Sequence, residues 1–231
     1  MFKSYKFRIY PNSEQRILMA KTFGCCRLVY NYFLNRKIKL YQADKSSISY
    51  AQCNKELTTL KKTDEFSFLS EVDSMSLQNS LRNLDNAYKK FFKENAGYPR
   101  FKSKHGGKKS YTTNFTNNNI EVSGNAVKLP KVKWVKAKIH RIFSGKIKSA
   151  TVSQTPSGKY YVSVLVETEN YSMLPPTDKK IGIDLGIKDL CITSDGKKYE
   201  NPKTLRKYEK RLAKEQRKLA HKQKLSRNRD K

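Results

Sequence analysis

Apolar and polar residues alternate in two separate parts of the chain, which is the pattern of β-strands with one buried face. At the N-terminus, Phe7 and Ile9 fall on one side of residues 5–10, and Pro11 ends the run. Six more short runs follow later, at residues 111–115, 120–122, 126–129, 134–139, 147–154 and 159–168. Strands this short, separated by turns, favour a small barrel. We expect the N-terminal strand to complete it.

Apolar residues at helical spacing dominate the stretch between these strand regions. Asn12 or Ser13 is expected to cap a first helix, Gly24 to break it, and a second helix to cover residues 25–41. Further helices are predicted over residues 46–63 and 74–95. The helices would then form an insertion after the first strand of the barrel. Two helices that meet at a glycine resemble a helix-turn-helix, although most helix pairs are only packing units.

A single acid interrupts a later apolar strand. Asp184 lies between Ile183 and Leu185, and a second apolar run then leads to the turn at Asp195-Gly196. We expect this strand to be buried, and an unpaired carboxylate is costly to bury. Asp184 is therefore predicted to bind a metal ion or a nearby cation. The alternative is that it caps a turn or pairs with a neighbouring lysine.

The segments on either side of this strand have distinct patterns. Residues 170–179, which include Pro175-Pro176, are predicted to be a linker. From residue 202 onward a helix is predicted, with an apolar stripe formed by Leu205, Tyr208, Leu212 and Leu219. We expect this stripe to pack on a sheet while the basic side of the helix meets nucleic acid.

Basic residues are spread along the whole chain. Its 231 residues include 49 Lys and Arg against 20 Asp and Glu, which gives a formal net charge of +29. So large a surplus repels itself unless a polyanion is near, which makes nucleic acid the first predicted partner. The sequence has no apolar run long enough for a membrane span. Its four cysteines include no C-x-x-C pair and are expected to be reduced and mostly buried in a cytoplasmic protein.

Two stretches carry candidate nucleic-acid contacts. Residues 97–104 alternate Arg100, Lys102 and Lys104 around Phe101, which suits tracking of a phosphate backbone with one aromatic anchor. The helix predicted over 74–95 has a second, polar face opposite its apolar stripe. Its members are Ser76, Gln78, Asn79, Arg82, Asn83 and Asn86. Asn and Gln can hydrogen-bond adenine edges and Arg guanine edges, while an ordinary solvated face is the alternative.

Four motifs occur in a fixed order along the chain. They are Tyr5-x-Phe7-Arg8-x-Tyr10-Pro11, Phe23-Gly24-x-Cys26-Arg27-x-Val29-Tyr30-Asn31, Gly97-Tyr98-Pro99-Arg100-Phe101-Lys102-Ser103 and Gly182-Ile183-Asp184-Leu185-Gly186. As an ordered set that covers essentially the full length, they resemble the TnpB (OrfB) proteins of bacterial insertion sequences. These proteins are RNA-guided DNA endonucleases, and they are similar to type V CRISPR effectors.

The resemblance implies an α+β fold with several parts. A wedge-type β-barrel would be formed by residues 1–12 and 105–170, with a helical recognition insertion over 13–104. A linker over 171–179 would lead to the start of a RuvC-like nuclease domain, of the ribonuclease-H fold, over 180–231. The implied partners are a guide RNA and double-stranded target DNA, with no membrane, in the cytoplasm at the nucleoid.

Site residues are implied by the same resemblance. Asp184 matches the first catalytic carboxylate, a ligand of Mg²⁺ in the intact nuclease. The helix over 74–94 corresponds to the region that contacts the duplex beside the target, which makes its candidates Ser74, Gln78, Asn79 and Arg82. The second catalytic acid of the family, its zinc ribbon and its final Asp would lie beyond residue 231.

We therefore expect this chain to act as an N-terminal portion that binds RNA and DNA without cleaving. One alternative is a nuclease-dead, RNA-guided repressor that occupies promoters. Another, an RNA-packaging protein, explains the charge but leaves the strand around Asp184 without a role.

Overall fold

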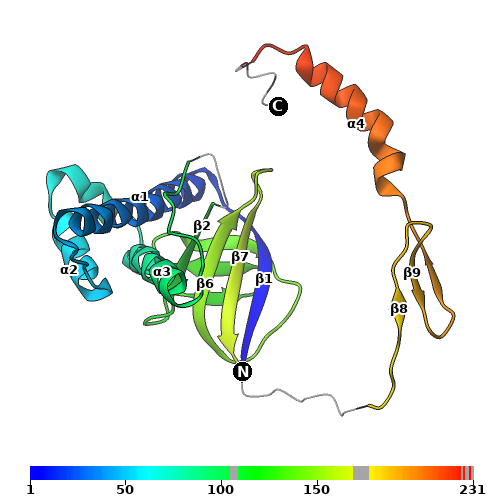
Figure 1. The fold of residues 1–231 in the computed structure, drawn as a ribbon, viewed down its shortest axis with the longest axis horizontal. Coiled ribbons are helices and arrows are strands. Elements are labelled where there is room, and N and C mark those ends of the chain that lie inside the picture. The colour runs from blue at the N-terminus through cyan, green and yellow to red at the C-terminus, as the bar shows by residue number, and fades with distance from the viewer. Residues whose placement is uncertain (105–108, 169–176, 225, 227–228, 230–231) are drawn as a thin grey trace. The chain divides into compact units, whose positions relative to one another are not determined.

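The computed structural model describes residues 1–104, 109–168, 177–224, 226 and 229 (Figure 1). The chain divides into two compact units, residues 1–172 and 173–231, and each is described by itself. The first unit combines helices with a seven-stranded sheet, and the second combines a three-stranded sheet with one helix. The predicted mixture of helices and strands is confirmed. Of the predicted linker, the part up to residue 176 lies outside the described residues.

The sheet of the first unit is antiparallel throughout. Its strands are β1 (Phe2–Tyr10), β2 (Lys109–Asn114), β3 (Glu121–Ser123), β4 (Ala126–Leu129), β5 (Lys133–Lys138), β6 (Lys146–Gln154) and β7 (Tyr160–Glu167). In space their order is β2-β6-β7-β1-β5-β4-β3. β1 is central because residues 2–9 pair with β7 while Arg8 to Tyr10 also pair with β5. The N-terminal strand thus joins the later strands, as predicted.

The closed barrel that we predicted is absent from the described strands, since β2 and β3 remain as the two edges of an open sheet. Helix α3 (Ser74–Lys93) lies along the β2 edge. The Asn79 side chain on α3 donates a hydrogen bond of 2.8 Å to the carbonyl oxygen of Thr112 on β2. The helix therefore satisfies a backbone carbonyl on the outer edge of β2, where an additional strand would otherwise pair.

The helices of the first unit are α1 (Ser13–Asp44), α2 (Tyr50–Leu60), a short 3₁₀ helix (Asp64–Ser70) and α3. The predicted break at Gly24 is wrong, because α1 runs through it without interruption for 32 residues. A glycine inside a helix costs only about 1 kcal/mol. Its neighbours Phe23, Cys25 and Cys26 are all buried, and their packing holds the helix together.

The start of α1 follows the sequence prediction and ties the helix to the sheet. The Asn12 side chain accepts a hydrogen bond from the Gln15 amide at 2.8 Å, and the Gln15 side chain accepts one from the Asn12 amide, which is a capping box. Gln15 also donates to the carbonyl oxygen of Trp134 on β5 at 2.8 Å. The N-terminus of α1 is therefore fixed against the sheet.

One core unites the sheet with the helices. Phe7 and Ile9 on β1 are buried, as the alternation predicted, and so are the alternate valines of β7. Helix α1 contributes Phe33 and Leu34, and α3 contributes Leu77, Leu81 and Leu84. None of the described helices is both long and apolar enough to cross a membrane.

The second unit contains β8 (Ile183–Asp184), β9 (Asp189–Thr193), β10 (Lys198–Glu200) and α4 (Thr204–Ala220). Contrary to prediction, most of its apolar positions around Asp184 are exposed: Ile183 is 62% exposed, and Leu185 and Ile187 are exposed even more. The four predicted stripe residues of α4 are exposed as well, so they do not pack on a sheet within the described residues. Three short strands form too small a layer to bury them.

The cysteines give a test of this fold. Cys25, Cys26 and Cys53 are buried, and burial raises the pKa of the Cys25 thiol to about 11. At pH 8 only about one Cys25 in a thousand is then a reactive thiolate. We expect a chromogenic disulfide reagent to titrate the half-buried Cys191 rapidly and the other three thiols only after unfolding in guanidinium. A Cys191→Ser variant, which should lose the rapid phase alone, is the control. Rapid reaction of all four would contradict the buried core.

Candidate nucleic-acid interface

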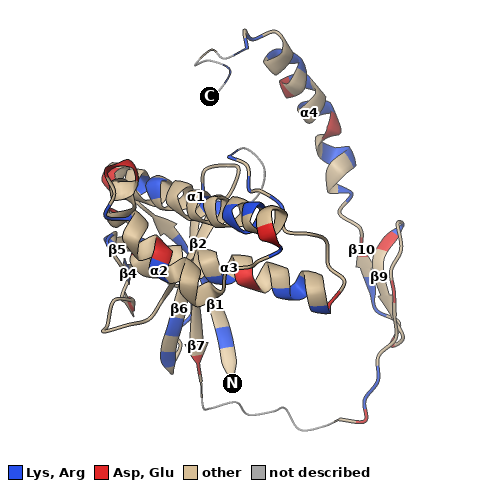
Figure 2. Ribbon diagram, turned by 60° about the vertical axis from the view of Figure 1, so that its left-hand side comes forward, with Lys and Arg blue, Asp and Glu red and all other residues tan. Residues whose placement is uncertain are grey.

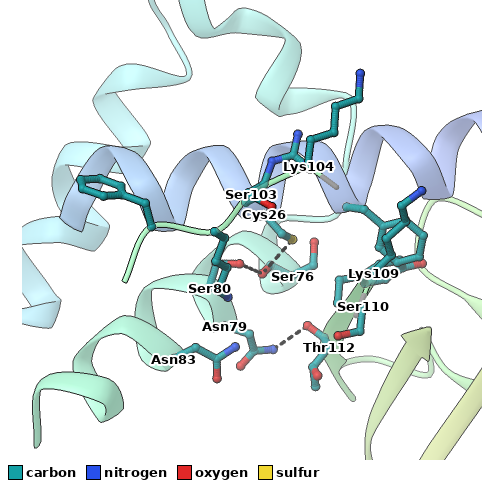
Figure 3. Close-up of a pocket in the computed structure, with 15 residues that line it drawn as sticks. Cys26, Ser76, Asn79, Ser80, Asn83, Ser103, Lys104, Lys109, Ser110 and Thr112 are labelled. Carbon is teal, nitrogen blue, oxygen red and sulfur yellow. Dashed lines mark hydrogen bonds between the residues drawn. The ribbon is translucent and has the colours of Figure 1, made fainter. Parts of the chain in front are cut away.

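A pocket of about 460 Å³ lies between α1, α3, β2 and the extended segment around Lys102 (Figure 3). Its cationic lining residues are Arg27, Lys102, Lys104 and Lys109. No acidic residue belongs to its described lining, so the pocket is electropositive. Figure 3 shows Asn79 and Thr112 joined by a hydrogen bond at one side of the pocket and Lys104 extending at the other.

The Asn31 side chain on α1 binds the backbone of the extended segment. Asn31 donates from Nδ2 to the carbonyl oxygen of Lys102 at 2.9 Å, and its Oδ1 accepts from the Lys102 amide at 2.8 Å. An amide side chain that pairs with both backbone groups of one residue copies the pairing of a neighbouring strand. Two of the motifs singled out in the sequence, which are 71 residues apart at this contact, are thus brought together.

The Lys102 side chain, although exposed, also contributes to this docking. Its Nζ lies 4.0 Å from the centre of the Tyr30 ring, in cation–π geometry. Burial lowers the pKa of Lys102, and the nearby Cys26 partly opposes that shift. Phe101 and Lys104 on either side of it are exposed, with Phe101 at 55%. Lys102 is thus anchored through its backbone and its contact with Tyr30, and it lines the pocket together with Phe101 and Lys104.

We expect an Asn31→Ala substitution to release this segment. It removes two hydrogen bonds worth about 0.5 to 1.5 kcal/mol each, so affinity for nucleic acid should fall about 5- to 100-fold. The Lys102 amide, which then has lost its acceptor, should exchange its hydrogen faster by a similar factor. Titration of a labelled oligonucleotide and hydrogen-exchange mass spectrometry measure the two effects. Asn35→Ala, an exposed asparagine one turn further along α1, should change neither.

The expectation that Ser76 and Asn79 lie on an exposed face of α3 is wrong. Ser76 is fully buried and Asn79 is 8% exposed. Asn79 donates to Thr112 and, at 3.3 Å, to the side-chain oxygen of Asn114. Asn79 faces β2, while Cys26 of α1 donates to the carbonyl oxygen of Ser76 at 3.5 Å, because α3 is covered by α1 on one side and by the sheet edge on another. Small and amide side chains permit that close approach.

The other predicted contacts on and near α3 lie outside the pocket of Figure 3. Ser74 accepts a hydrogen bond from the Lys61 ammonium at 3.2 Å. The Arg82 guanidinium lies over the Tyr50 ring, 5.7 Å from its centre. Gln78 is half-buried, and Arg100 is exposed. Of the eight predicted contact residues, the pocket brings together Asn79, Phe101, Lys102 and Lys104. Their binding role stays a prediction.

The sequence did not identify two cations of the pocket, and it assigned no binding role to the face of the first strand that carries Lys6, Arg8 and Tyr10. Arg27 and Lys109 also line the pocket. In the sequence, Arg27 belongs to one of the four motifs, and Lys109 belongs to none. On the sheet, residues of β1 that alternate with the buried Phe7 and Ile9 form a basic and aromatic face. Lys6 lies over the Tyr161 ring at 4.9 Å, and Arg8 lies over the Tyr10 ring at 5.2 Å. The register places Lys138 and Lys136 of β5 beside Arg8 and Tyr10.

Asp184 is exposed, so the expectation that it is buried in an apolar strand is wrong. It lies on β8, a two-residue strand at the edge of the sheet, opposite Ile192 of β9. Among the described residues, no three His, Cys, Asp or Glu side chains come together in a way that could hold a metal ion. A two-metal site needs several carboxylates. The described residues therefore do not fit such a site by themselves.

Comparison with known proteins supplies the family. Residues 1–46 match a model of OrfB proteins of the IS605 type described as "Helix-turn-helix domain", and residues 163–231 match one described as "Probable transposase". In this structure residues 13–44 of the first match form the single helix α1.

Two curated relatives align along nearly the whole chain, and both carry the name RNA-guided DNA endonuclease. The protein from Streptomyces pristinaespiralis is 38% identical over 234 residues, which are 99% of this chain and 57% of that protein. InsQ from Escherichia coli is 32% identical over 226 residues, which are 98% of this chain and 56% of InsQ. A CRISPR-Cas12f ternary complex aligns with 94% of this chain and 54% of its own at 12% identity and a TM-score of 0.48.

The family matches and the relatives define the class, which is that of transposase-related proteins of insertion sequences. Within that class, the chain belongs to the TnpB (OrfB) family. It spans a little over half the length of the two curated relatives.

Proposed function

We propose that this chain is the nucleic-acid-binding part of an RNA-guided DNA endonuclease of an insertion sequence. Membership of the TnpB family and the names of both relatives support this proposal, as does the net charge of +29, with Lys and Arg spread over the helices and strands of both units (Figure 2). In this proposal the curved sheet of the first unit is the wedge-type domain and its helices are the recognition insertion. The second unit would then begin a RuvC-like nuclease domain.

The observation that carries the proposal is the assembly of the electropositive pocket. Asn31 clamps the segment around Lys102 onto α1, and this contact joins two family motifs at one place. Phosphate groups suit the exposed Lys104 and Lys109, and an exposed base suits the ring of Phe101. The basic and aromatic face on β1 offers a second surface of the same chemistry, which suits the guide RNA.

Cleavage is proposed to require more carboxylates than the described residues bring together. Mg²⁺ would supply a hydroxide nucleophile and stabilise the leaving oxygen. Asp184 offers one exposed carboxylate as a ligand. Because it lies on an edge strand, further carboxylate ligands can approach it. We therefore propose that these 231 residues bind guide RNA and target DNA but do not cut.

The experiment has a binding arm and a cleavage arm. The chain is purified from a host that carries the insertion sequence, and the nucleic acid that remains bound is extracted and sequenced. A structured RNA from the element is expected, and its absence together with a lack of RNA affinity would refute the proposal. Guide RNA, matched DNA and Mg²⁺ are then added. Cleavage that disappears in an Asp184→Asn variant would show that the chain is a complete nuclease after all.

Asp184 is exposed and belongs to no cluster of metal-binding side chains among the described residues, which also favours a second candidate, a nuclease-dead RNA-guided repressor. Both candidates bind without cutting, so the gene distinguishes them. An open reading frame that continues past codon 231 and encodes further Glu and Asp residues supports the endonuclease. A stop codon there supports the repressor.

A further inference from the structure

A second hollow lies in the helical part of the first unit, away from the pocket of Figure 3. It has a volume of about 760 Å³ and is formed by the C-terminal parts of α1 and α3, the segment from Ser46 to Ser49, and Tyr98. Five aromatic rings line it, those of Tyr41, Tyr88, Phe91, Phe92 and Tyr98. A volume of this size is typical of sites for small organic groups.

The rings hold one another in place. Tyr88 and Phe92 are nearly parallel, with an angle of 21° and centres 6.3 Å apart. Tyr98 meets Phe91 edge to face at 5.3 Å, and its hydroxyl lies 2.9 Å from that of Tyr88. Despite this order, the Phe92 side chain is 74% exposed. A flat apolar ring that is fixed by its neighbours and open to solvent is a stacking surface without a described partner.

The charges around these rings are positive. Lys37, Lys45, Lys89 and Lys93 line the hollow, and the one acid among its described lining residues is Asp85. Asp85 is already paired with Lys89 at 2.8 Å. The Lys45 ammonium lies 4.8 Å from the centre of the Tyr41 ring, and Lys37 donates to the carbonyl oxygen of Ile48. An occupant with a negative charge is therefore favoured.

The chemistry of the occupant follows from these two properties. A nucleotide joins a flat ring system to a negatively charged phosphate, which matches exposed rings beside lysines. A second copy of this chain fits less well, because each copy has a net charge of +29 and the two would repel. In a duplex the bases are already stacked and their faces are covered, so an unpaired base is the better match.

We propose that this hollow holds an unpaired nucleotide of a bound single strand, with its base on the Phe92 ring and its phosphate near Lys45 or Lys93. The inference rests on the proposed function, which supplies the nucleic acid. It adds a stacking site on α3, separate from the pocket of Figure 3, and it predicts that a single-stranded segment crosses the helices.

The test uses the full chain and a short single-stranded oligouridine that carries iodouridine, which crosslinks to aromatic side chains under light. The crosslinked peptide is expected to contain Phe92, Tyr41 or Tyr98. Phe92→Ala should weaken binding of the oligouridine about 5- to 100-fold, and Phe92→Trp should preserve it. Phe92 is mostly exposed, so its replacement leaves the core intact. Phe68→Ala removes an exposed ring that does not line the hollow and should leave binding unchanged.

Three outcomes would overturn the inference. If Phe92→Ala binds as wild type does and the crosslinks map elsewhere, the stacking site is refuted while the proposed function stands. If light scattering shows a wild-type dimer that Phe92→Ala converts to a monomer, a second copy occupies the hollow. If the chain binds no RNA or DNA under any condition, the proposed function fails and the stacking site fails with it.

Discussion

The affinity of this chain for RNA or DNA should fall about 10³- to 10⁵-fold between 50 and 200 mM salt, which corresponds to about 6 to 10 neutralised phosphates. Each phosphate contact releases condensed counterions, so added salt opposes binding. The formal charge of +29 and two separate basic surfaces in the first unit make several simultaneous contacts feasible. Anisotropy of a labelled oligonucleotide, measured across a series of salt concentrations, gives the slope.

A probe of the same base sequence with an uncharged peptide backbone is the matched control. It keeps the bases but releases no counterions, so its affinity should be weaker and almost independent of salt. A flat response of the natural oligonucleotide would show that base contacts rather than phosphates dominate. The net positive charge would then need an explanation other than phosphate binding.

The strands and most of the core were accessible from the sequence, because alternation is a local property. The run at residues 126–129 matches β4 at both ends, and Phe7 and Ile9 are buried as predicted. Gly24 was misread for a related reason. A local preference of about 1 kcal/mol weakens a helix, and the buried neighbours on the same turn outweigh it.

Two of the wrong burial predictions, those for α3 and for Asp184, have different causes. A helical pattern predicts one buried stripe, but α3 packs on both α1 and β2, so Ser76 and Asn79 are buried although they lie off the leucine stripe. Asp184 was predicted to be buried and is exposed, which is the opposite error. Its apolar neighbours indicate a buried strand, yet no described element covers the β8 edge, and Ile183 and Leu185 remain exposed. Pattern alone does not state how many layers a sheet will have.

The pocket was only partly predictable, because its parts are distant in sequence. The segment from Arg100 to Lys104 was recognised by its charge, and the motif that ends at Asn31 by its resemblance to a family. Neither signal indicates that Asn31 bonds the backbone of Lys102. Side-chain to backbone pairing at this separation depends on the tertiary fold. The structure therefore converts two separate candidates into one site.

Replacement of Arg27, Lys104 and Lys109 together by alanine should have the largest effect of any substitution at this pocket. Each lost phosphate contact lowers the salt slope by about 0.9, so three lower it by about 2.7, and affinity at 100 mM salt should fall about 10²- to 10³-fold. Lys102 is left in place because its contact with Tyr30 holds the segment, and its loss would mix unfolding with charge. Circular dichroism should show an unchanged fold.

The matched control replaces Lys39, Lys55 and Lys62, three exposed lysines of the same unit that do not line the pocket. Both triple variants change the net charge by the same amount. If the phosphates bind in the pocket, the control keeps most of the affinity and nearly the whole salt slope. If the two variants weaken binding equally, the attraction comes from the diffuse field of the protein, and the pocket is not where the phosphates bind. The difference between the two slopes therefore counts the phosphates that the pocket itself contacts.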